Sequence, residues 1–372
     1  MRQRPMSPLF ITRKFPPSVG GMQTLAAGVW RALERRAPEA RIIAHGGSNR
    51  ELPAWLFHAL PRAAGAIARH RVDSVLTGDA LTYALCRPLI RAGRLPHATM
   101  IMGLDVTYQN RIYRTLVYPA LRRAPRIIAI SRATAEAAIE IGVHPERISV
   151  VRLGIQAPEV GDEERREAAQ AVRRTFSIGE DQIIVLTLGR LVRRKGIGWF
   201  IRRILPRLPR NVTYVVVGAG PLLNDLQSTV EELGLARRVH TLGSVDDAER
   251  ERLLRAADLF VQPNIRVPGD MEGFGLVVLE AAMRGTTTVA SGIEGILDAV
   301  VDGETGILLP PEDETAWVDR LNTLLSAPDR LHALGARFRA AARRLYSEDQ
   351  MGEQLLELIS QQGPTPLAEP ES

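Results

Sequence analysis

The sequence predicts an α/β protein built from two Rossmann-like, doubly wound parallel-sheet domains that face each other across a cleft. Strand-like apolar runs alternate with helix-like segments along the chain, the pattern typical of parallel α/β folds. The length of 372 residues exceeds what one hydrophobic core serves. The alternation restarts after residues 156–180, which are charged and contain no strand-like run. We therefore place the domain junction in that stretch.

The apolar runs identify the strands in order. In the first half they are SPLFIT, ARIIAHG, VDSVLTG, HATMIMG, RIIAIS and ISVVRLG, and in the second half QIIVLTLGR, VTYVVVGAG, RVHTLGS, ADLFVQP, TTTVASG and TGILLPP. The predicted parts are an N-terminal domain (1–160), a C-terminal domain (161–345), a helix returning to the first domain (346–362) and a disordered tail (363–372). A cleft between the domains is the expected binding site.

Composition limits the functional classes. Hydrophobic residues at 45% and charged residues at 24% are ordinary globular values, and no apolar run reaches the ~18 residues of a membrane span. The single cysteine, Cys86, excludes an internal disulfide and a cysteine metal cluster. The basic start MRQRPMSPLFITRKFPP is interrupted by prolines and lacks a cleavage site, so a cytoplasmic protein is expected.

The charge indicates an anionic partner. A net charge of +6 and a pI near 9.9 suit nucleic acid, an anionic membrane surface or a phosphorylated ligand. Without aromatic ladders or a long basic tail, nucleic acid is not expected. Lysine occurs only at Lys14 and Lys195, both in glycine-containing stretches. A lysine is a compact point charge where arginine is a planar fork, so these positions suggest a geometric demand, with chance placement as the alternative.

Two glycine motifs follow predicted strands. Gly20 and Gly21 lie between a strand and a helix, where glycine permits close approach of a ligand and the helix N-terminus favours an anion. A tight turn explains them equally well. In VVVGAGPLLNDL, Gly218 and Gly220 follow a strand, but Leu223 stands where a dinucleotide fingerprint requires a third glycine. A dehydrogenase is therefore excluded, while a backbone packed near a nucleotide is not.

Basic residues in LTLGRLVRRKGIG follow the predicted strand QIIVLTLGR. Arg190 and Lys195 lie at its carboxyl end, where ligands of parallel sheets usually bind. A guanidinium and an ammonium there could hold a pyrophosphate and stabilise it as it leaves. A solvated charge run is the alternative, and it is the better interpretation for Arg193 and Arg194.

The stretch DMEGFGLVVLEAAMRG carries two glutamates. A helix is expected over about 276–284, and its first turn offers free N–H groups and a positive dipole end. Glu272 lies just before that turn and can accept hydrogen bonds from sugar hydroxyls. Glu280 is embedded among apolar residues and needs a partner, which the vicinal hydroxyls of a ribose would supply. The structural alternatives are a dipole partner for Glu272 and an interhelix salt bridge for Glu280.

Taken in order, the motifs resemble those of the retaining nucleotide-sugar glycosyltransferases of family 4, which have the GT-B architecture. The resemblance covers nearly all of residues 8–345. It is carried by FPPSVGG, GLDVTY, ISRATAEAA, GRLVRRKG, VVVGAGP, RVHTLGSV, ADLFVQPN, EGFGLVVLEAAMRG and DGETGILLPPED. The second-domain motifs are highly specific as an ordered set, and the first-domain ones are looser.

The resemblance implies an acceptor-side first domain, a donor-binding second domain and a set of site residues. Glu272 would contact the donor hexose, Glu280 the ribose, and Arg190 with Lys195 the diphosphate. The remaining donor-binding residues would be Gly20 and Gly21 over the diphosphate, Gly218, Gly243 to Val245 near the base, and Gly273, Phe274, Gly275 and Leu276 at the sugar. No prosthetic group and no essential metal are implied, and the sequence contains no Asp-x-Asp to carry a divalent cation.

The sequence departs from the family pattern at Met102, where many relatives carry a histidine. Methionine can neither accept a proton nor donate a strong hydrogen bond, so Asp105 is the polar catalytic candidate that remains near the acceptor. The expected activity is retaining transfer of a hexose from GDP-mannose or a UDP-hexose to a glycan, a lipid-linked or a small-molecule acceptor. The alternatives are a nucleotide-sugar epimerase, for which no histidine stands in a suggestive motif, and a donor-binding protein with weak turnover.

One further segment suggests membrane contact. In RIYRTLVYPALRRAPR, residues 111–126, basic and apolar residues fall near helical spacing: Arg111, Arg114 and Arg122 beside Leu116, Val117 and Leu121. Such a segment can lie on anionic lipid, which would place the protein on the inner face of the membrane next to a lipid-linked acceptor. The alternative is a helix packed on the domain core with its arginines in water, and Pro119 argues against one uninterrupted helix.

Overall fold

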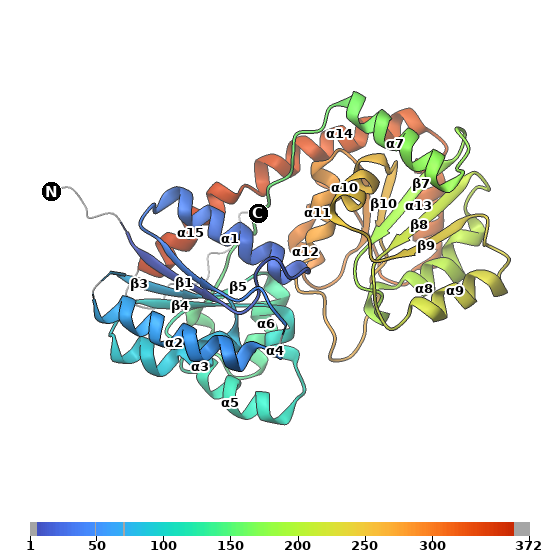
Figure 1. Ribbon diagram of the computed structural model, residues 1–372. Helices are drawn as coiled ribbons and strands as arrows, with labels where there is room; N and C mark the ends of the chain where they lie inside the picture. The colour runs from blue at the N-terminus through green and yellow to red at the C-terminus, as the bar shows by residue number, and fades with distance from the viewer. Residues whose placement is uncertain (1–5, 49, 70, 361–372) are drawn as a thin grey trace. The chain divides into compact units, whose positions relative to one another are not determined.

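The computed structural model describes residues 6–48, 50–69 and 71–360. The chain forms two compact units, of which the first comprises 1–156 together with 346–372 and the second comprises 157–345. The predicted disordered tail, 363–372, lies outside the described residues. Each unit contains one parallel β-sheet with helices packed against it (Figure 1).

The first unit is built on a 6-stranded parallel sheet of order β2-β1-β3-β4-β5-β6. Its strands are β1 (Pro8–Thr12), β2 (Arg41–Ala44), β3 (Ser74–Thr77), β4 (His97–Ile101), β5 (Ile127–Ala129) and β6 (Ile148–Val150). Its helices are α1 (Gly21–Arg36), α2 (Leu52–Ala68), α3 (Ala80–Ala92), α4 (Gly103–Thr107), α5 (Arg111–Leu121), α6 (Arg132–Glu140), the 3-10 turn η1 (Pro145–Arg147) and α15 (Glu348–Ser360). Figure 1 shows α1 and α15 on one side of this sheet and α2 and α3 on the other.

The second unit is built on a 6-stranded parallel sheet of order β12-β11-β10-β7-β8-β9. Its strands are β7 (Ile183–Leu188), β8 (Val212–Val217), β9 (Val239–Gly243), β10 (Leu259–Gln262), β11 (Thr287–Ser291) and β12 (Ile307–Leu309). Its α-helices are α7 (Asp162–Phe176), α8 (Ile197–Trp199), α9 (Leu223–Glu232), α10 (Asp247–Ala256), α11 (Leu276–Met283), α12 (Ile296–Ala299), α13 (Glu314–Leu325) and α14 (Pro328–Leu345). Short 3-10 and π segments are η2 (Arg193–Lys195), η3 (Phe200–Ile204) and η4 (Leu205–Arg207).

The predicted fold class is confirmed, and each predicted strand-like run contains a strand. A parallel sheet is covered on both faces, so its strands read as nearly continuous apolar runs rather than as alternating patterns. Every residue of β1 and of β8 is buried accordingly. This is why short apolar runs located the strands reliably.

The strand order marks one position in each sheet where a ligand site is expected. The order reverses direction between β1 and β3 in the first sheet and between β7 and β10 in the second. In open α/β sheets, ligands bind outside the carboxyl ends of the strands at this switch point. The loops that follow these four strands are therefore where we expect the ligand-binding residues.

The first unit is completed by the last helix of the chain. α15 packs along α1, where Glu348 receives Arg31 at 2.6 Å and Arg35 at 2.9 Å. A Cβ on Gly352 would lie 2.8 Å from the carbonyl oxygen of Ala32, so glycine lets the two helices approach closely. Residues from both ends of the chain thus form one hydrophobic unit.

Within the described ranges, none of the helices is both long and apolar enough to span a bilayer.

Candidate active site

The two predicted cations of the loop after β7 differ in burial. Arg190 is exposed, whereas Lys195 is buried, with 7% of its surface accessible. The next residue, Gly196, has φ of 64°, and a Cβ there would lie 1.8 Å from the carbonyl oxygen of Pro263. Because glycine avoids that clash, the loop after β7 packs directly against the segment after β10. The loops of the two switch-point strands are in contact.

Lys195 forms the shortest ion pair of Glu272. Its Nζ lies 2.6 Å from Glu272 Oε2, the Nδ2 of Asn264 donates to the same oxygen at 3.0 Å, and Arg194 Nε lies 3.5 Å away. Burial alone would raise the pKa of the Glu272 carboxyl, but Lys195 and Arg194 outweigh it and lower this pKa to about 2. Glu272 is therefore a fixed carboxylate at neutral pH, with a lysine ammonium held against it.

Arg194 is not solvated as the sequence predicted. A solvated position was the predicted interpretation, and it is wrong, because Arg194 is buried and its Nη1 lies 2.8 Å from Asp270 Oδ1. The 3-10 turn η2 directs Arg194 inward while the adjacent Arg193 stays exposed. A run of like charges in the sequence gives no sign of which member turns inward. The acidic residues of GDMEG, two positions apart, were the available signal.

The turn before α11 is held from a third loop. Glu272 N donates to Glu294 Oε2 at 2.6 Å, and Gly295 N donates to Glu272 O at 3.1 Å. Gly275 has φ of 91° and precedes the first residue of α11, while Phe274 is buried. The predicted Gly273–Leu276 turn thus lies at the start of the predicted helix, with its backbone fixed by the segment after β11.

Unpaired polar groups lie at the ends of two neighbouring strands, β10 and β11. Gln262 and Ser291 end β10 and β11, and their buried side-chain polar atoms have no hydrogen-bond partner among the described residues. Gln262 Nε2 lies 3.5 Å from where a Cβ of Gly275 would be. Buried polar groups are normally satisfied, so this cluster has capacity for a polar ligand. Gln262 and Ser291 lie at the ends of apolar runs, and nothing in the sequence indicated that their side chains would be buried and unpaired.

Glu280 has a protein partner in the second unit. It is buried in α11 and forms an ion pair with Arg250 of α10. This contact is the interhelix salt bridge that the sequence analysis gave as the structural alternative for Glu280. The role of Glu280 toward a ribose remains a prediction.

The other glycines of the second unit shape the same edge of the sheet. A Cβ on Gly218 would lie 1.8 Å from the carbonyl oxygen of Gly189, so this glycine joins the loops after β8 and β7. Gly243 ends β9 with φ of 67°, and nothing lies within 4 Å of its Cβ position. Val245 follows in the loop before α10 and is half-buried. A turn with open space beside it lies where the base was predicted.

In the first unit, the predicted residues fall after β1 and β4. Gly20 and Gly21 are exposed at the start of α1, and Gly20 has φ of 151°. Asp105 is buried in α4, where Met102 N donates to its Oδ2 at 2.9 Å and the hydroxyl of Tyr113 donates to its Oδ1 at 3.2 Å. Both carboxyl oxygens of Asp105 are therefore engaged.

A second carboxylate and a guanidinium surround Asp105, and neither was predicted. Arg13 follows β1, and its Nε lies 2.8 Å from Oδ1 of Asp79, which follows β3. Burial, followed by the charge of Asp79, raises the pKa of Asp105 to about 7, and Arg13 opposes this shift. A carboxyl group with a pKa near neutrality can exchange a proton at physiological pH. The switch point of the first sheet thus carries a titratable acid.

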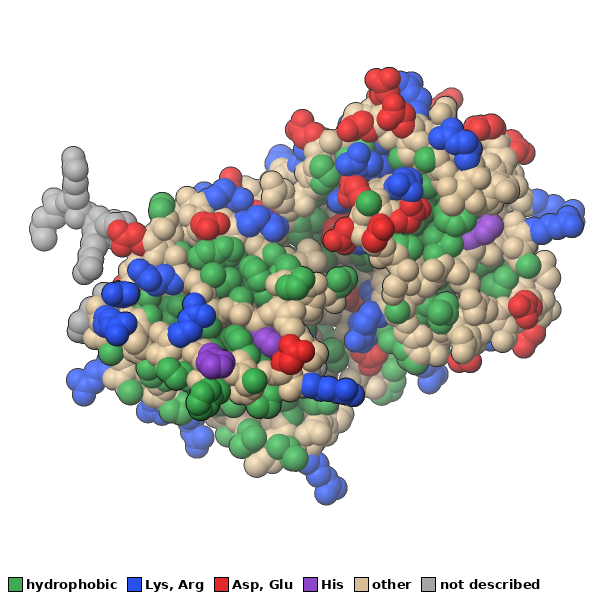
Figure 2. Space-filling model, in the orientation of Figure 1, with side chains coloured by type: hydrophobic (Ala, Val, Ile, Leu, Met, Phe, Trp, Pro, Cys, Tyr) green, Lys and Arg blue, Asp and Glu red, His purple; other side chains and the backbone are tan. Residues whose placement is uncertain are grey.

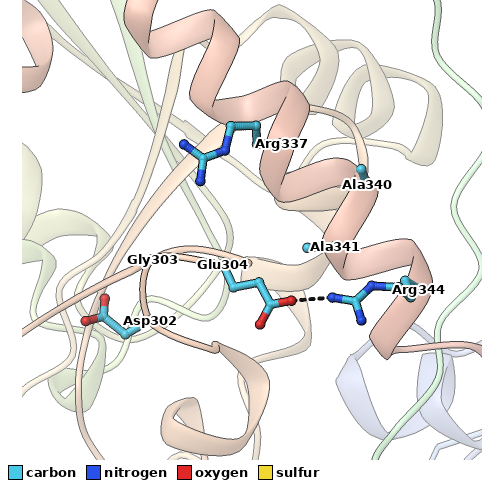
Figure 3. Close-up of a pocket in the computed structure, with 7 residues that line it drawn as sticks. All are labelled: Asp302, Gly303, Glu304, Arg337, Ala340, Ala341 and Arg344. Atoms are coloured by element: carbon cyan, nitrogen blue, oxygen red, sulfur yellow. Dashed lines mark hydrogen bonds and ion pairs between the residues drawn. The ribbon is translucent and has the colours of Figure 1, made fainter.

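A separate open cavity of about 720 Å³ lies elsewhere in the second unit. Figure 3 shows its lining: Asp302, Gly303 and Glu304 face Arg337, Ala340, Ala341 and Arg344 of α14, and Arg344 pairs with Glu304. The turn at 302–304 precedes β12, so it lies at the amino end of that strand. The candidate site lies at the carboxyl ends, and this cavity is not part of it.

No group of three or more His, Cys, Asp or Glu side chains that could hold a metal ion is found in the part of the chain that the structure describes.

Comparison with known proteins identifies the family. A family model described as Glycosyl transferases group 1 matches residues 169–343, and one described as Glycosyltransferase Family 4 matches residues 19–157. A D-inositol 3-phosphate glycosyltransferase of Xylanimonas cellulosilytica is 30% identical over 92% of this chain and 77% of its own length. The chain belongs to glycosyltransferase family 4.

Two further similarities bear on this glycosyltransferase. A GDP-mannose-dependent alpha-(1-6)-phosphatidylinositol monomannoside mannosyltransferase of Mycolicibacterium smegmatis is 28% identical over 95% of this chain and 98% of its own length. The crystal structure of Anabaena HepE in complex with UDP has a TM-score of 0.75 at 20% identity, covering 95% of this chain and 100% of HepE. The structural likeness shows the GT-B fold.

Proposed function

We propose that this glycosyltransferase transfers a hexose from a nucleoside-diphosphate sugar with retention of configuration at the anomeric carbon. The observation that carries the proposal is the Lys195–Glu272 pair at the switch point of the second sheet, beside the start of α11. A cation for a diphosphate and a carboxylate for sugar hydroxyls stand 2.6 Å apart there. The donor candidates are GDP-mannose and a UDP-hexose. The name of the mycobacterial relative describes it as GDP-mannose-dependent.

Each predicted residue takes a role in binding the donor. Lys195 and the exposed Arg190 hold the diphosphate, Glu272 accepts hydrogen bonds from the hexose, and Glu280 accepts them from the ribose. The remaining donor-binding residues are Gly20, Gly21, Gly218, Gly243, Val245, Gly273, Phe274, Gly275 and Leu276. Free N–H groups at the start of α11 add a positive dipole end.

The chemistry we propose is electrostatic. As the bond between the anomeric carbon and the diphosphate breaks, negative charge grows on the leaving oxygen, and the Lys195 ammonium stabilises it more in the transition state than in the ground state. Glu272 keeps that ammonium in place. Neither a prosthetic group nor an essential metal takes part in this proposal.

The acceptor is proposed to be lipid-linked, with Asp105 as the polar group that handles it. Asp105 is buried beside an arginine and a second carboxylate, which supports proton exchange near pH 7. The mycobacterial relative is named for a phosphatidylinositol monomannoside acceptor. A cytoplasmic protein that contacts the inner face of a membrane would reach such a molecule.

The surface of α5 supports this membrane contact, although with different residues from those predicted. Val117 and Leu121 are buried in the core of the first unit, so their predicted place on the lipid side is wrong. For these two residues the alternative, a helix packed on the domain core, is what the structure has. Instead, large apolar side chains are exposed at every fourth position: Leu104, Tyr108, Ile112 and Leu116. We call these four residues, with Arg111 and Arg114, the α5 surface. Hydrophobic side chains are visible at the surface where α5 lies (Figure 2).

The charge around the α5 surface suits anionic lipid. Ile112 and Leu116 are 72% and 62% exposed and lie one turn apart on the outward side of α5. Arg111 and Arg114 are also exposed, and the only acidic residue between positions 103 and 126, Asp105, is buried. Arg122 instead donates to the carbonyl oxygen of Ile141 at 2.6 Å. Apolar side chains flanked by cations are what interfacial helices present to membranes.

A donor panel tests the proposal. The protein is incubated with GDP-mannose, UDP-glucose and UDP-galactose, with and without phosphatidylinositol or glycan acceptors, and the released nucleoside diphosphate is quantified. Release that depends on the acceptor, with an α-linked product by NMR from an α-linked donor, is the expected result. Conversion of the donor to an isomer would instead indicate an epimerase, and binding without release would indicate a donor-binding protein.

A further inference from the structure

The Arg250–Glu280 ion pair connects the first turn of α10 with the second turn of α11, two helices that begin at the carboxyl edge of the second sheet. α10 follows β9 and α11 follows β10, so both helices begin at the edge where the candidate site lies. Arg250 Nη2 contacts Glu280 Oε2, and the two side chains are 28% and 11% exposed. A carboxylate buried to this extent requires a partner, and Arg250 is that partner.

The pair leaves hydrogen-bonding capacity on both groups. Within the described part of the chain, Glu280 Oε1 has no hydrogen-bond partner, and one nitrogen of the Arg250 guanidinium is engaged. Each carboxylate oxygen has two lone pairs, and a guanidinium carries five N–H donors. A ligand hydroxyl can therefore reach Glu280 without breaking its contact with Arg250.

Holding the two helices together does not by itself explain this pair. α10 and α11 are already joined by a second ion pair, in which the buried Arg284 donates through Nε to both carboxylate oxygens of Glu251 at 2.9 Å. Arg284 lies one turn beyond Glu280, at the end of α11, whereas Glu251 is the residue directly after Arg250 in α10. The Arg250 pair stands closer to the β9–α10 loop, where the nucleotide base is proposed.

We propose that Arg250 is a positioning residue for nucleotide recognition. Its guanidinium fixes the Glu280 carboxylate so that the free oxygen accepts the ribose hydroxyls, which makes the site distinguish a ribonucleotide from one without these hydroxyls. Arginine suits this task because its planar group sets direction as well as charge, whereas lysine supplies charge alone. The inference rests on the proposed function, since it needs a nucleotide donor.

The test compares nucleotides with and without ribose hydroxyls. Calorimetry measures the affinities of GDP, UDP and their 2′,3′-dideoxy analogues for the wild type and for Arg250→Ala, Arg250→Lys and Glu280→Gln. Wild type should bind the ribonucleotide about tenfold or more tightly than its dideoxy analogue, the effect of a hydrogen bond to a charged group. This ratio should fall towards one in Arg250→Ala and Glu280→Gln and be intermediate in Arg250→Lys.

Arg252→Ala is the matched control. Arg252 lies two residues along α10, is exposed and pairs with Glu249 of the same helix, so its removal should leave the ratio unchanged. If Arg250→Ala does not fold, the neutral double variant Arg250→Gln/Glu280→Gln replaces it and should lose the ratio too.

The outcomes separate the two proposals. If Arg250→Ala keeps the wild-type ratio and only melts at a lower temperature, the pair is structural, and the inference is overturned while the proposed function stands. If the wild type binds neither GDP nor UDP, the proposed function fails, and the inference fails with it. A retained ratio in Glu280→Gln would show that another residue recognises the ribose.

Discussion

Lys195 Nζ lies 2.6 Å from Glu272 Oε2, and both side chains are buried at the switch point of the second sheet. The lysine is therefore held by a carboxylate on one side while its other N–H groups remain available. Lysine is rare in this chain, which otherwise uses arginine as its cation. One of its two lysines thus stands where a compact ammonium meets a buried carboxylate.

Replacing Lys195 should therefore affect turnover more than binding. Lys195→Ala should lower kcat by about 10²-fold or more while donor affinity changes less, because charge on the leaving oxygen grows towards the transition state. Steady-state kinetics and calorimetry on the same preparations measure the two effects. Lys195→Arg should remain impaired, and wild-type kinetics in that variant would show that only the charge matters.

Acid should weaken the second unit through Glu272. The pKa of this residue in the folded protein, about 2, lies below the ordinary value of 4.5. The folded state therefore binds fewer protons than the unfolded state between these values, so stability from Glu272 is present above pH 4.5 and is lost as pH falls towards 2. Denaturant unfolding from pH 6 to pH 2.5 should show this loss in the wild type.

Glu272→Gln isolates that contribution. At pH 6 the variant should be less stable by about 3 kcal/mol, because Lys195 loses its buried counter-charge. The gap between variant and wild type should narrow as pH falls below 4.5. A gap that stays constant down to pH 2.5 would contradict the lowered pKa.

Asp105 should produce the opposite pH dependence. Its folded pKa, about 7, lies above the ordinary value of 3.8, so the folded state binds more protons than the unfolded state between these values. Stability is then highest, with respect to this group, below pH 3.8 and falls as pH rises through 7. The melting temperature of the wild type minus that of Asp105→Asn should decline as the pH rises from 4 to 8. A flat difference would show that Asp105 ionises normally.

Two glycines with the same backbone angle should respond differently to alanine. Gly196 and Gly234 both have φ of 64°, but a Cβ would lie 1.8 Å from Pro263 O at Gly196 and meets nothing within 4 Å at Gly234. Gly234→Ala should cost about 1–2 kcal/mol from backbone strain alone. Gly196→Ala should cost clearly more and should weaken donor binding, because it separates the loops after β7 and β10. Equal losses of stability would show that the loops move apart freely.

The α5 surface should bind anionic vesicles. The wild type should co-sediment at low salt with vesicles of phosphatidylcholine and phosphatidylglycerol, and less with phosphatidylcholine alone. Ile112→Asp/Leu116→Asp should abolish this binding, and Arg111→Ala/Arg114→Ala should weaken it. Phe57→Asp, at an exposed apolar residue of α2, is the control and should bind as the wild type does. A wild type that stays in the supernatant would remove the membrane from the proposal and favour a soluble acceptor.

The strands were predictable from sequence, and the partners of the site residues were not. Buried parallel strands leave a local apolar signature, and glycines at their ends mark the loops. Tertiary pairing leaves none: Arg250 is 30 positions from Glu280, and Arg194 sits in a charge run that looks solvated. Asp79 and Arg13 come together with Asp105 only because parallel strands end at one edge. Sequence identified which groups carry charge, and the fold decided which of them are buried.

α15 also constrains how the protein is made. The first unit includes residues 346–372, so its last helix leaves the ribosome after the whole second unit has been synthesised. At ~5–20 residues per second, the intervening stretch takes on the order of ten to forty seconds, long enough for it to fold. Until then the side of α1 that packs against α15 is uncovered, and Arg31 and Arg35 lack their partner Glu348. The part of the protein that is translated first is therefore the last to be finished.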